Sequence, residues 1–262
     1  QLTVLSTAQI QSLRSDHIAA LKTSQITLLT PAQITSLKTD QVQAITPADL
    51  ALMTSGQLAA LTTDQVVALT TSQIQSLTPA QVGLLSTSQI VSLEIVDLQA
   101  MTTAQIQGLT TTQVANLTTQ ELVSLTSSQL IALKTNQMAA LTPDETIALT
   151  TTQISQLLPT QVANLSTAST VSLTSGQIVA LTAADVAGLR TAQIAVLTSD
   201  QINALETGDI AGLAAGQLTV LSTAQIQSLR SDHIAALKTS QITLLTPAQI
   251  TLSLIHISEP TR

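Results

Sequence analysis

The octad Thr102-Thr103-Ala104-Gln105-Ile106-Gln107-Gly108-Leu109 is the phrase from which the chain is built. It recurs with almost no insertions or deletions from Gln1 to about Ile250. When each octad is numbered from its glutamine, there are 32 starts, and 23 of them are Gln. The other nine starts are His17, Asp49, Asp97, Glu121, Glu145, Ser169, Asp185, Asp209 and His233.

Two apolar residues three apart define each octad. Position 2 is Ile, Val, Leu or Met except at Thr146 and Thr170, and position 5 is nearly always Leu. In a strand this spacing would send the two side chains to opposite faces, whereas in a helix they share one face. A single continuous helix fails, because the apolar stripe would drift by about 80° per octad. The pattern therefore predicts a helix that breaks once in every octad.

The break is predicted at position 6. Thr or Ser stands there in most octads, three residues before the Gln of position 1, as in Thr102 and Gln105. This spacing is a capping box, in which the hydroxyl and the longer side chain each bind the other residue's backbone N–H. Six prolines stand at position 7, where a helix tolerates proline as its first residue. They are Pro31, Pro47, Pro79, Pro143, Pro159 and Pro247.

Charges agree with short helices that begin at position 7. Twelve of the fourteen acidic residues in the array occupy position 8 or position 1, within the first turn, where the helix dipole favours negative charge. The seven basic residues all occupy position 6, directly after the preceding helix, where we expect them to face its negative end. We predict a helix of about two turns in each octad, from position 7 to about position 4 or 5.

The substitutions of the octad recur with a period of three octads. None of the nine non-Gln starts falls in the register that contains Gln9, Gln33 and Gln105. A turn made of three octads explains why every third octad shares an environment. The predicted fold is therefore all-α: a solenoid of short capped helices, one per octad and three per turn, so that three octads form one triangular layer.

Tandem T-x-x-Q-I-x-x-L octads resemble the repeats of very large bacterial proteins with a triangular-prism architecture called the Toblerone fold. The resemblance covers residues 1–251. It implies a long, secreted or surface-associated bacterial protein, and it brings no catalytic residues to carry over. Because the chain begins inside an octad, we expect 1–251 to be a fragment of a longer array.

Composition narrows the classes of partner. The chain has 262 residues, no Phe, Tyr, Trp or Cys, and a net charge of −7. Without aromatic side chains or an excess of positive charge, we expect no nucleic-acid partner. Apolar residues make up 44% of the sequence, but Gln and Thr interrupt them every few residues, so we expect no membrane insertion.

Two features set the end of the chain apart. Residues 217–251 repeat residues 1–35 letter for letter, at a spacing of twenty-seven octads. A recent duplication and a misjoined assembly of repetitive DNA both explain that identity. Residues 252–262, which include His256 and Glu259, depart from the octad and resemble a translated sequencing adapter, so we treat them as a non-native tail.

The array offers little sign of catalytic chemistry. Its only acid–histidine pairs are Asp16-His17 and Asp232-His233, and we interpret each His as a substitute for a capping Gln. No Cys, no H-x-x-x-H spacing and no calcium-loop motif is present. We therefore expect no enzymatic activity, no catalytic, cofactor-binding or metal-binding residues, and no cofactor.

The leading functional hypothesis is a structural module, a rigid spacer or stalk in a large bacterial secreted or surface protein, such as an adhesin. Its expected partners are the neighbouring repeats and unknown flanking domains, and its expected location is outside the cell or on the cell surface. The alternative is a binding module for polysaccharide or ice, in which regular Thr, Ser and Gln rows form the recognition face. A surface glycan would then be a partner.

Overall fold

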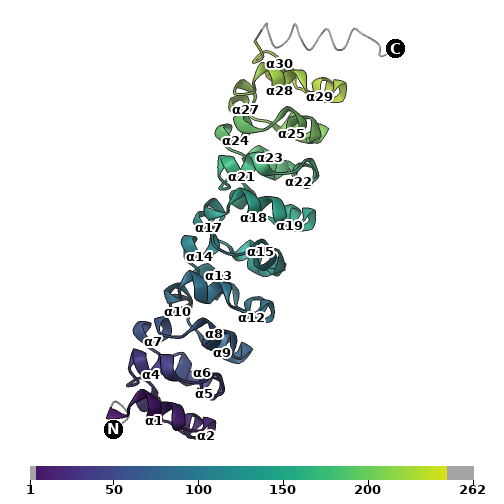
Figure 1. Cartoon of the computed structure of the whole chain (residues 1–262). Coiled ribbons are helices and arrows are strands. Elements are labelled where there is room, and N and C mark those ends of the chain that lie inside the picture. The colour runs from purple at the N-terminus through teal and green to yellow at the C-terminus, as the bar shows by residue number, and fades with distance from the viewer. Residues whose placement is uncertain (1–3, 247–262) are drawn as a thin grey trace. The chain divides into compact units, whose positions relative to one another are not determined.

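The structure, a computed structural model, describes residues 4–246 (Figure 1). Within that range it consists of thirty helices of four to six residues and has no strand, which confirms the all-α prediction. The chain divides into two compact units, Gln1–Leu133 and Lys134–Arg262. The tail predicted at residues 252–262 and the sixth octad proline, Pro247, lie outside the described residues.

Each helix begins where the octad predicts. In α13 (Thr103–Gly108), the N-cap Thr102 is extended, with φ −69° and ψ 157°. Its hydroxyl accepts from the backbone N–H of Gln105 at 3.2 Å, and the Gln105 side chain accepts from the N–H of Thr102 at 2.8 Å. The two donors that a helix start would leave unpaired are thus satisfied. Pro31, Pro47, Pro79, Pro143 and Pro159 are each the first helical residue, as predicted.

Seventeen of the thirty described helices end at position 4, as predicted, and the other thirteen end one or two residues earlier, at position 3 or 2. The position-5 residue lies beyond the helix in every octad that the structure describes. Leu109, for example, is extended with φ −58° and ψ 135°. Its N–H donates to the carbonyl of Ile106, three residues earlier, at 3.2 Å, which closes the last turn tightly. The six-residue helices therefore have nearly two turns, and the shorter ones have just over one.

In the first unit, helices three apart in sequence contact one another and form three columns (Figure 1). The first column is α1 (Thr7–Ser12), α4 (Pro31–Ser36), α7 (Ser55–Ala59), α10 (Pro79–Leu84), α13 and α16 (Ser127–Ala132). The second is α2 (Ser15–Ala19), α5 (Thr39–Gln43), α8 (Thr63–Val67), α11 (Thr87–Val91) and α14 (Thr111–Val114). The third is α3 (Thr23–Ile26), α6 (Pro47–Leu50), α9 (Thr71–Ser76), α12 (Ile95–Ala100) and α15 (Thr119–Ser124).

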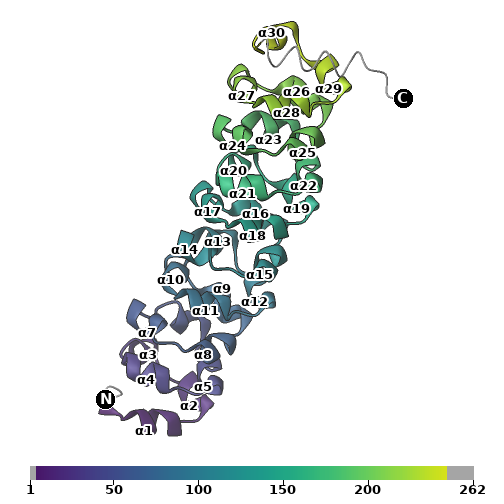
Figure 2. The same cartoon turned by 45° about the horizontal axis from the view of Figure 1, so that its top comes forward.

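The second unit repeats this arrangement (Figure 2). Its first column is α19 (Thr151–Gln156), α22 (Ser175–Val179), α25 (Ser199–Ala204) and α28 (Thr223–Gln227). Its second is α17 (Thr135–Ala140), α20 (Pro159–Val162), α23 (Ala183–Gly188), α26 (Thr207–Gly212) and α29 (Ser231–Ala236). Its third is α18 (Pro143–Ala148), α21 (Thr167–Ser172), α24 (Thr191–Val196) and α27 (Ala215–Thr219), followed in the same register by α30 (Thr239–Ile242). Three helices per turn are thus confirmed in each unit.

The core of each unit is built from positions 2 and 5. Ile106 is fully buried and Leu109 is 4% exposed, and nearly every other octad gives similar values. Each octad contributes two aliphatic side chains to the space enclosed by the columns, and their burial provides the main apolar stabilisation. Within residues 4–246, no helix has the length and apolarity needed to cross a membrane.

Candidate functional site

The repeated Gln makes a second set of hydrogen bonds that joins layers. The side-chain oxygen of Gln57 accepts from the N–H of Thr54 at 2.9 Å, as the capping box requires. Its Nε2 donates to the carbonyls of Ile26 and Leu29, each at 2.8 Å. These two residues stand 31 and 28 positions earlier, at the end of α3. One amide therefore caps the start of its own helix and the end of a helix in the layer before, and we call this arrangement the amide bridge.

The amide bridge recurs in both units. Beyond Gln57, donation to the carbonyls 28 and 31 residues earlier is made by Gln41, Gln65, Gln73, Gln81, Gln89, Gln105, Gln113 and Gln129, and by Gln177, Gln193, Gln217 and Gln225. All of these side chains are buried. They are therefore not on the outer surface, where a Gln row would have to lie to recognise a ligand.

Basic residues at position 6 keep half of the capping box. The N–H of Lys38 still donates to Gln41 at 2.8 Å, although lysine supplies no hydroxyl to the helix start. Arg190 differs from the prediction that the position-6 cations face the directly preceding helix. Arg190 donates to the carbonyl of Leu165 at 3.3 Å, which follows α20, four helices before α24. The Arg190 side chain is thus long enough to contact the previous layer of the solenoid.

Acidic residues at position 1 lack the N–H donors of glutamine, and two of them acquire a donor from another helix. The Thr23 hydroxyl donates to Asp49 at 2.6 Å, and the Thr71 hydroxyl donates to Asp97 at 2.8 Å. Both threonines stand 26 residues before the carboxylate. These buried carboxylates are therefore satisfied by hydroxyls.

Where position 1 is Ser169 or His233, its side chain binds the carbonyl 28 residues earlier in place of the Gln amide. The Ser169 hydroxyl donates to the carbonyl of Leu141 at 2.7 Å, and Nε2 of His233 lies 3.0 Å from the carbonyl of Leu205, each 28 residues earlier. Nδ1 of His233 accepts from the N–H of Arg230 at 3.4 Å. Only the neutral imidazole protonated on Nε2 can make both contacts. Burial and neighbouring Arg230 lower the pKa of His233, and Asp232 opposes them.

Within residues 4–246, three buried carboxylates keep an oxygen without a hydrogen-bond partner. They are Glu121, Glu145 and Asp185. Burial raises the pKa of Glu145, and the charge of Asp144 adds to the increase. Burial also raises the pKa of Asp209, helped by the negative charges of Glu206 and Asp185. The side-chain oxygen of Gln156 is also buried without a partner, and these unpaired oxygens are the polar defects of the described residues.

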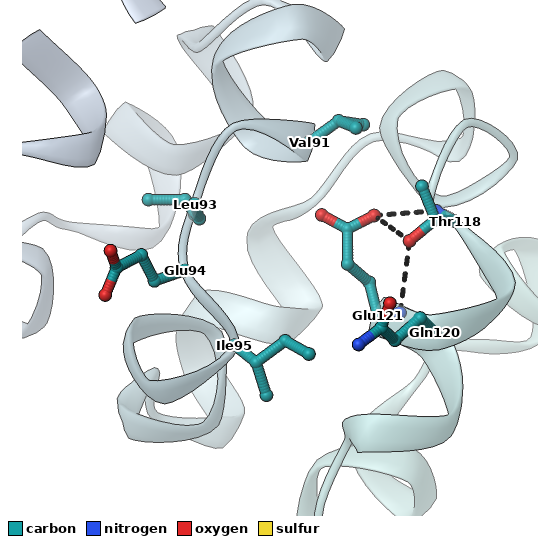
Figure 3. A pocket seen from close by; sticks show the side chains of 7 residues that line it. All are labelled: Val91, Leu93, Glu94, Ile95, Thr118, Gln120 and Glu121. Carbon is teal, nitrogen blue, oxygen red and sulfur yellow. Dashed lines mark hydrogen bonds between the residues drawn. The ribbon is translucent and has the colours of Figure 1, made fainter. Parts of the chain in front are cut away.

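A pocket of about 430 Å³ lies beside one of these defects (Figure 3). One wall comes from the α11–α12 connection and the start of α12, and the other from the start of α15. The lining residues are Val91, Leu93, Glu94, Ile95, Thr118, Gln120 and Glu121. The octad pattern did not predict this pocket, although a Glu at a Gln position was the signal that could have located it.

Exposed aliphatic side chains form a row on the third column of the second unit. Ile147 of α18, Val171 of α21, Val196 of α24 and Val220 just after α27 are 37–48% exposed, and each stands in the layer after the one before it. The octad pattern does not mark these residues, because positions 3 and 4 vary from octad to octad.

The two acid–histidine pairs are not arranged as a catalytic pair. Asp16 and Asp232 bind Arg14 and Arg230 at 2.8 and 3.1 Å, and these arginines lower the pKa of both carboxyls. The imidazoles of His17 and His233 instead accept from the backbone N–H of the same arginines. Each His therefore takes the capping position that the sequence analysis assigned to it. In the described part of the chain, no three His, Cys, Asp or Glu residues are grouped closely enough to hold a metal ion.

Short capped helices in three columns, joined by buried amides, define a tandem-repeat solenoid. Comparison with protein families agrees: the model of the ALTTAQ repeat matches residues 42–79, 90–127, 170–207 and 202–239. Together these segments cover more than half of the chain, which belongs to the ALTTAQ repeat family. Ala60-Leu61-Thr62-Thr63-Asp64-Gln65 differs from the family phrase in one letter and contains the capping box. No curated protein matches the chain.

Proposed function

We propose that the chain is a structural module, a stiff spacer or stalk of triangular-prism architecture within a large bacterial secreted or surface protein of the adhesin type. The observation that supports a spacer is the amide bridge. Because most Gln residues bind both their own helix and the layer before, neighbouring layers are held by hydrogen bonds as well as by apolar contacts. Neighbour interfaces of this kind let stability grow with the number of repeats.

The spacer role can be tested by varying the length of the array. Fluorophores are placed at both ends of the full chain and of chains lengthened internally by whole layers of three octads. For a stiff module the end-to-end distance rises linearly with the number of added layers, whereas for a flexible tether it rises with about the square root of length. Square-root growth would exclude the spacer role. A matched chain with Gln→Glu in several bridges should lose the linear dependence.

The location proposal needs its own test. We place the array outside the cell or on the cell surface, with flanking domains at its ends. Sequencing the complete gene and labelling intact cells with an antibody against the array would test both points. Labelling only after the cells are permeabilised would contradict a surface location.

A second proposed function is a repetitive binding face for polysaccharide or ice. The observation that favours it is the aliphatic row from Ile147 to Val220, because exposed aliphatic groups on successive layers can match a partner of regular spacing. The measurements are glycan-array binding and inhibition of ice recrystallisation. Val196→Lys and Val220→Lys should abolish either activity if this row is the binding face, and exposed Val179→Lys on α22 serves as the control.

A further inference from the structure

The pocket beside Glu121 lacks the side-chain N–H donor that Gln supplies at position 1 of most octads. Glu121 replaces the Gln of position 1 and is 5% exposed. Its Oε2 accepts from both the N–H and the hydroxyl of Thr118 at 2.7 Å. The other oxygen, Oε1, is buried and has no partner. Figure 3 shows it directed across the pocket toward the α11–α12 connection.

A normal amide bridge shows what is missing here. Gln89 donates to the carbonyls of Leu58 and Leu61 at 2.9 and 2.7 Å. The residue 28 positions before Glu121 is Leu93, which lines the pocket. The carboxylate of Glu121 has no N–H to donate, and among the described residues the Leu93 carbonyl accepts no hydrogen bond. Two acceptors, a carboxylate oxygen and a carbonyl oxygen, thus stand at one pocket without a donor.

The other residues that line the pocket indicate the charge and the apolar part of the ligand. Glu94 adds a second carboxylate at the rim, where it is exposed, and Figure 3 shows it turned away from Glu121. Val91 and Ile95 supply apolar surface. A metal ion would meet only one carboxylate directed inward. A group with several N–H donors, one positive charge and a short apolar stem fits all of these walls.

We propose that this pocket binds a primary alkylammonium group, either a lysine side chain of a partner or a free amine. The ammonium donates to Oε1 of Glu121 and to the carbonyl of Leu93, and its methylene groups lie against Val91 and Ile95. Glu94 attracts the charge without having to touch it. The site is independent of the spacer role, because it uses a position where the amide bridge is absent.

The test uses the full chain labelled with ¹⁵N and titrated with butylammonium chloride at constant ionic strength. Saturable amide shifts are expected at Val91–Ile95 and Thr118–Glu121. Tetramethylammonium, which has the charge but no N–H donor, should produce no saturable shifts there. Equal shifts with both ions, or no saturation with butylammonium, would overturn the proposal.

Two variants distinguish binding at this pocket from non-specific attraction of a cation to the acidic chain. Glu121→Gln should weaken butylammonium binding by at least about tenfold, because it fills the position with an amide that satisfies the carbonyl. It restores the usual octad residue, so the chain should remain folded. Glu206→Gln makes the same charge change at an exposed N-cap in the second unit and should leave binding unchanged. Unchanged binding by Glu121→Gln would overturn the proposal.

A last comparison identifies the source of the ammonium group. Nα-acetyl-lysine methylamide carries the same group on a peptide unit. If it binds within about tenfold of butylammonium, a lysine of a partner protein can occupy the pocket. Saturable binding of butylammonium alone supports a free amine as the ligand.

Discussion

Nε2 of Gln57 donates to the carbonyl oxygen of Leu29, 28 residues earlier in the chain, at 2.8 Å. The same amide accepts from its own N-cap, so its donor and its acceptor are both used. Glutamate could serve the capping half of this arrangement but not the half that joins layers. This difference explains why position 1 is so often Gln, and it leads to the first two predictions.

Gln105→Glu should destabilise the first unit by about 2–4 kcal/mol. It removes donation to Ile74 and Leu77, both at 2.7 Å, and places a buried charge against two carbonyls. Urea unfolding followed by far-UV circular dichroism measures the change. Gln107→Glu is the matched control in the same helix, and because Gln107 is exposed it should change stability by less than about 0.5 kcal/mol. Equal effects of the two substitutions would show that the amide bridge is unimportant.

Glu121→Gln should act in the opposite direction and stabilise the first unit by about 1–2 kcal/mol, since it pairs the Leu93 carbonyl and removes a buried unpaired oxygen. Asp64→Asn provides a charge-matched control. Asp64 is exposed in the first turn of α8, so its loss should cost about 0.3–1 kcal/mol of favourable interaction with the helix dipole. The same urea measurement applies, and a loss of stability in Glu121→Gln would contradict the prediction.

His233 should make the second unit less stable in acid. Its pKa is lowered from 6.5 by burial and by Arg230, so between the lowered value and 6.5 the folded chain binds fewer protons than the unfolded chain. Stability from this group is therefore present above pH 6.5 and is lost as the pH falls through the lowered pKa. His233→Gln should remove this dependence in thermal unfolding measured across that pH range. His17→Gln is the control, because His17 has the same sequence neighbours but is exposed, and the variant should keep the dependence.

Gly108→Ala should destabilise the first unit by about 1–3 kcal/mol. A Cβ at Gly108 would overlap the backbone carbonyl of Pro79, where α10 and α13 pack against each other. Gly212→Ala is the control, since a Cβ there meets nothing within 4 Å and the helix gains about 0.5 kcal/mol from the lower entropy of the unfolded chain. Denaturation midpoints of the two variants should move in opposite directions.

Local structure could be predicted from the sequence because each octad carries its own signals. Thr102 and Gln105 mark a helix start, and Pro31 confirms the same position independently. The period of three octads predicts three helices per turn, because substitutions share an environment only when they share a column. These features depend on residues within one octad or on the spacing of exceptions, and both are visible in the sequence.

The contacts between layers could not be predicted in the same way. Nothing in the sequence shows that the amide of Gln57 lies beside Leu29, because that depends on how one layer sits on the next. The Glu121 pocket was missed for the same reason, since its second wall comes from the octads of the previous layer. The preference for Gln over Glu at position 1 was the available sign that the amide N–H has a partner.

The amide bridge also bears on how such a protein can evolve. The two carbonyls that accept from the Gln of each amide bridge belong to positions 2 and 5 of an octad in the layer before. If one whole layer is inserted or deleted, every remaining Gln therefore still meets the carbonyls of positions 2 and 5. The identity of residues 1–35 with 217–251 is spaced by nine such layers. Recombination between copies can therefore change the reach of the molecule one layer at a time, without a new interface having to arise by mutation.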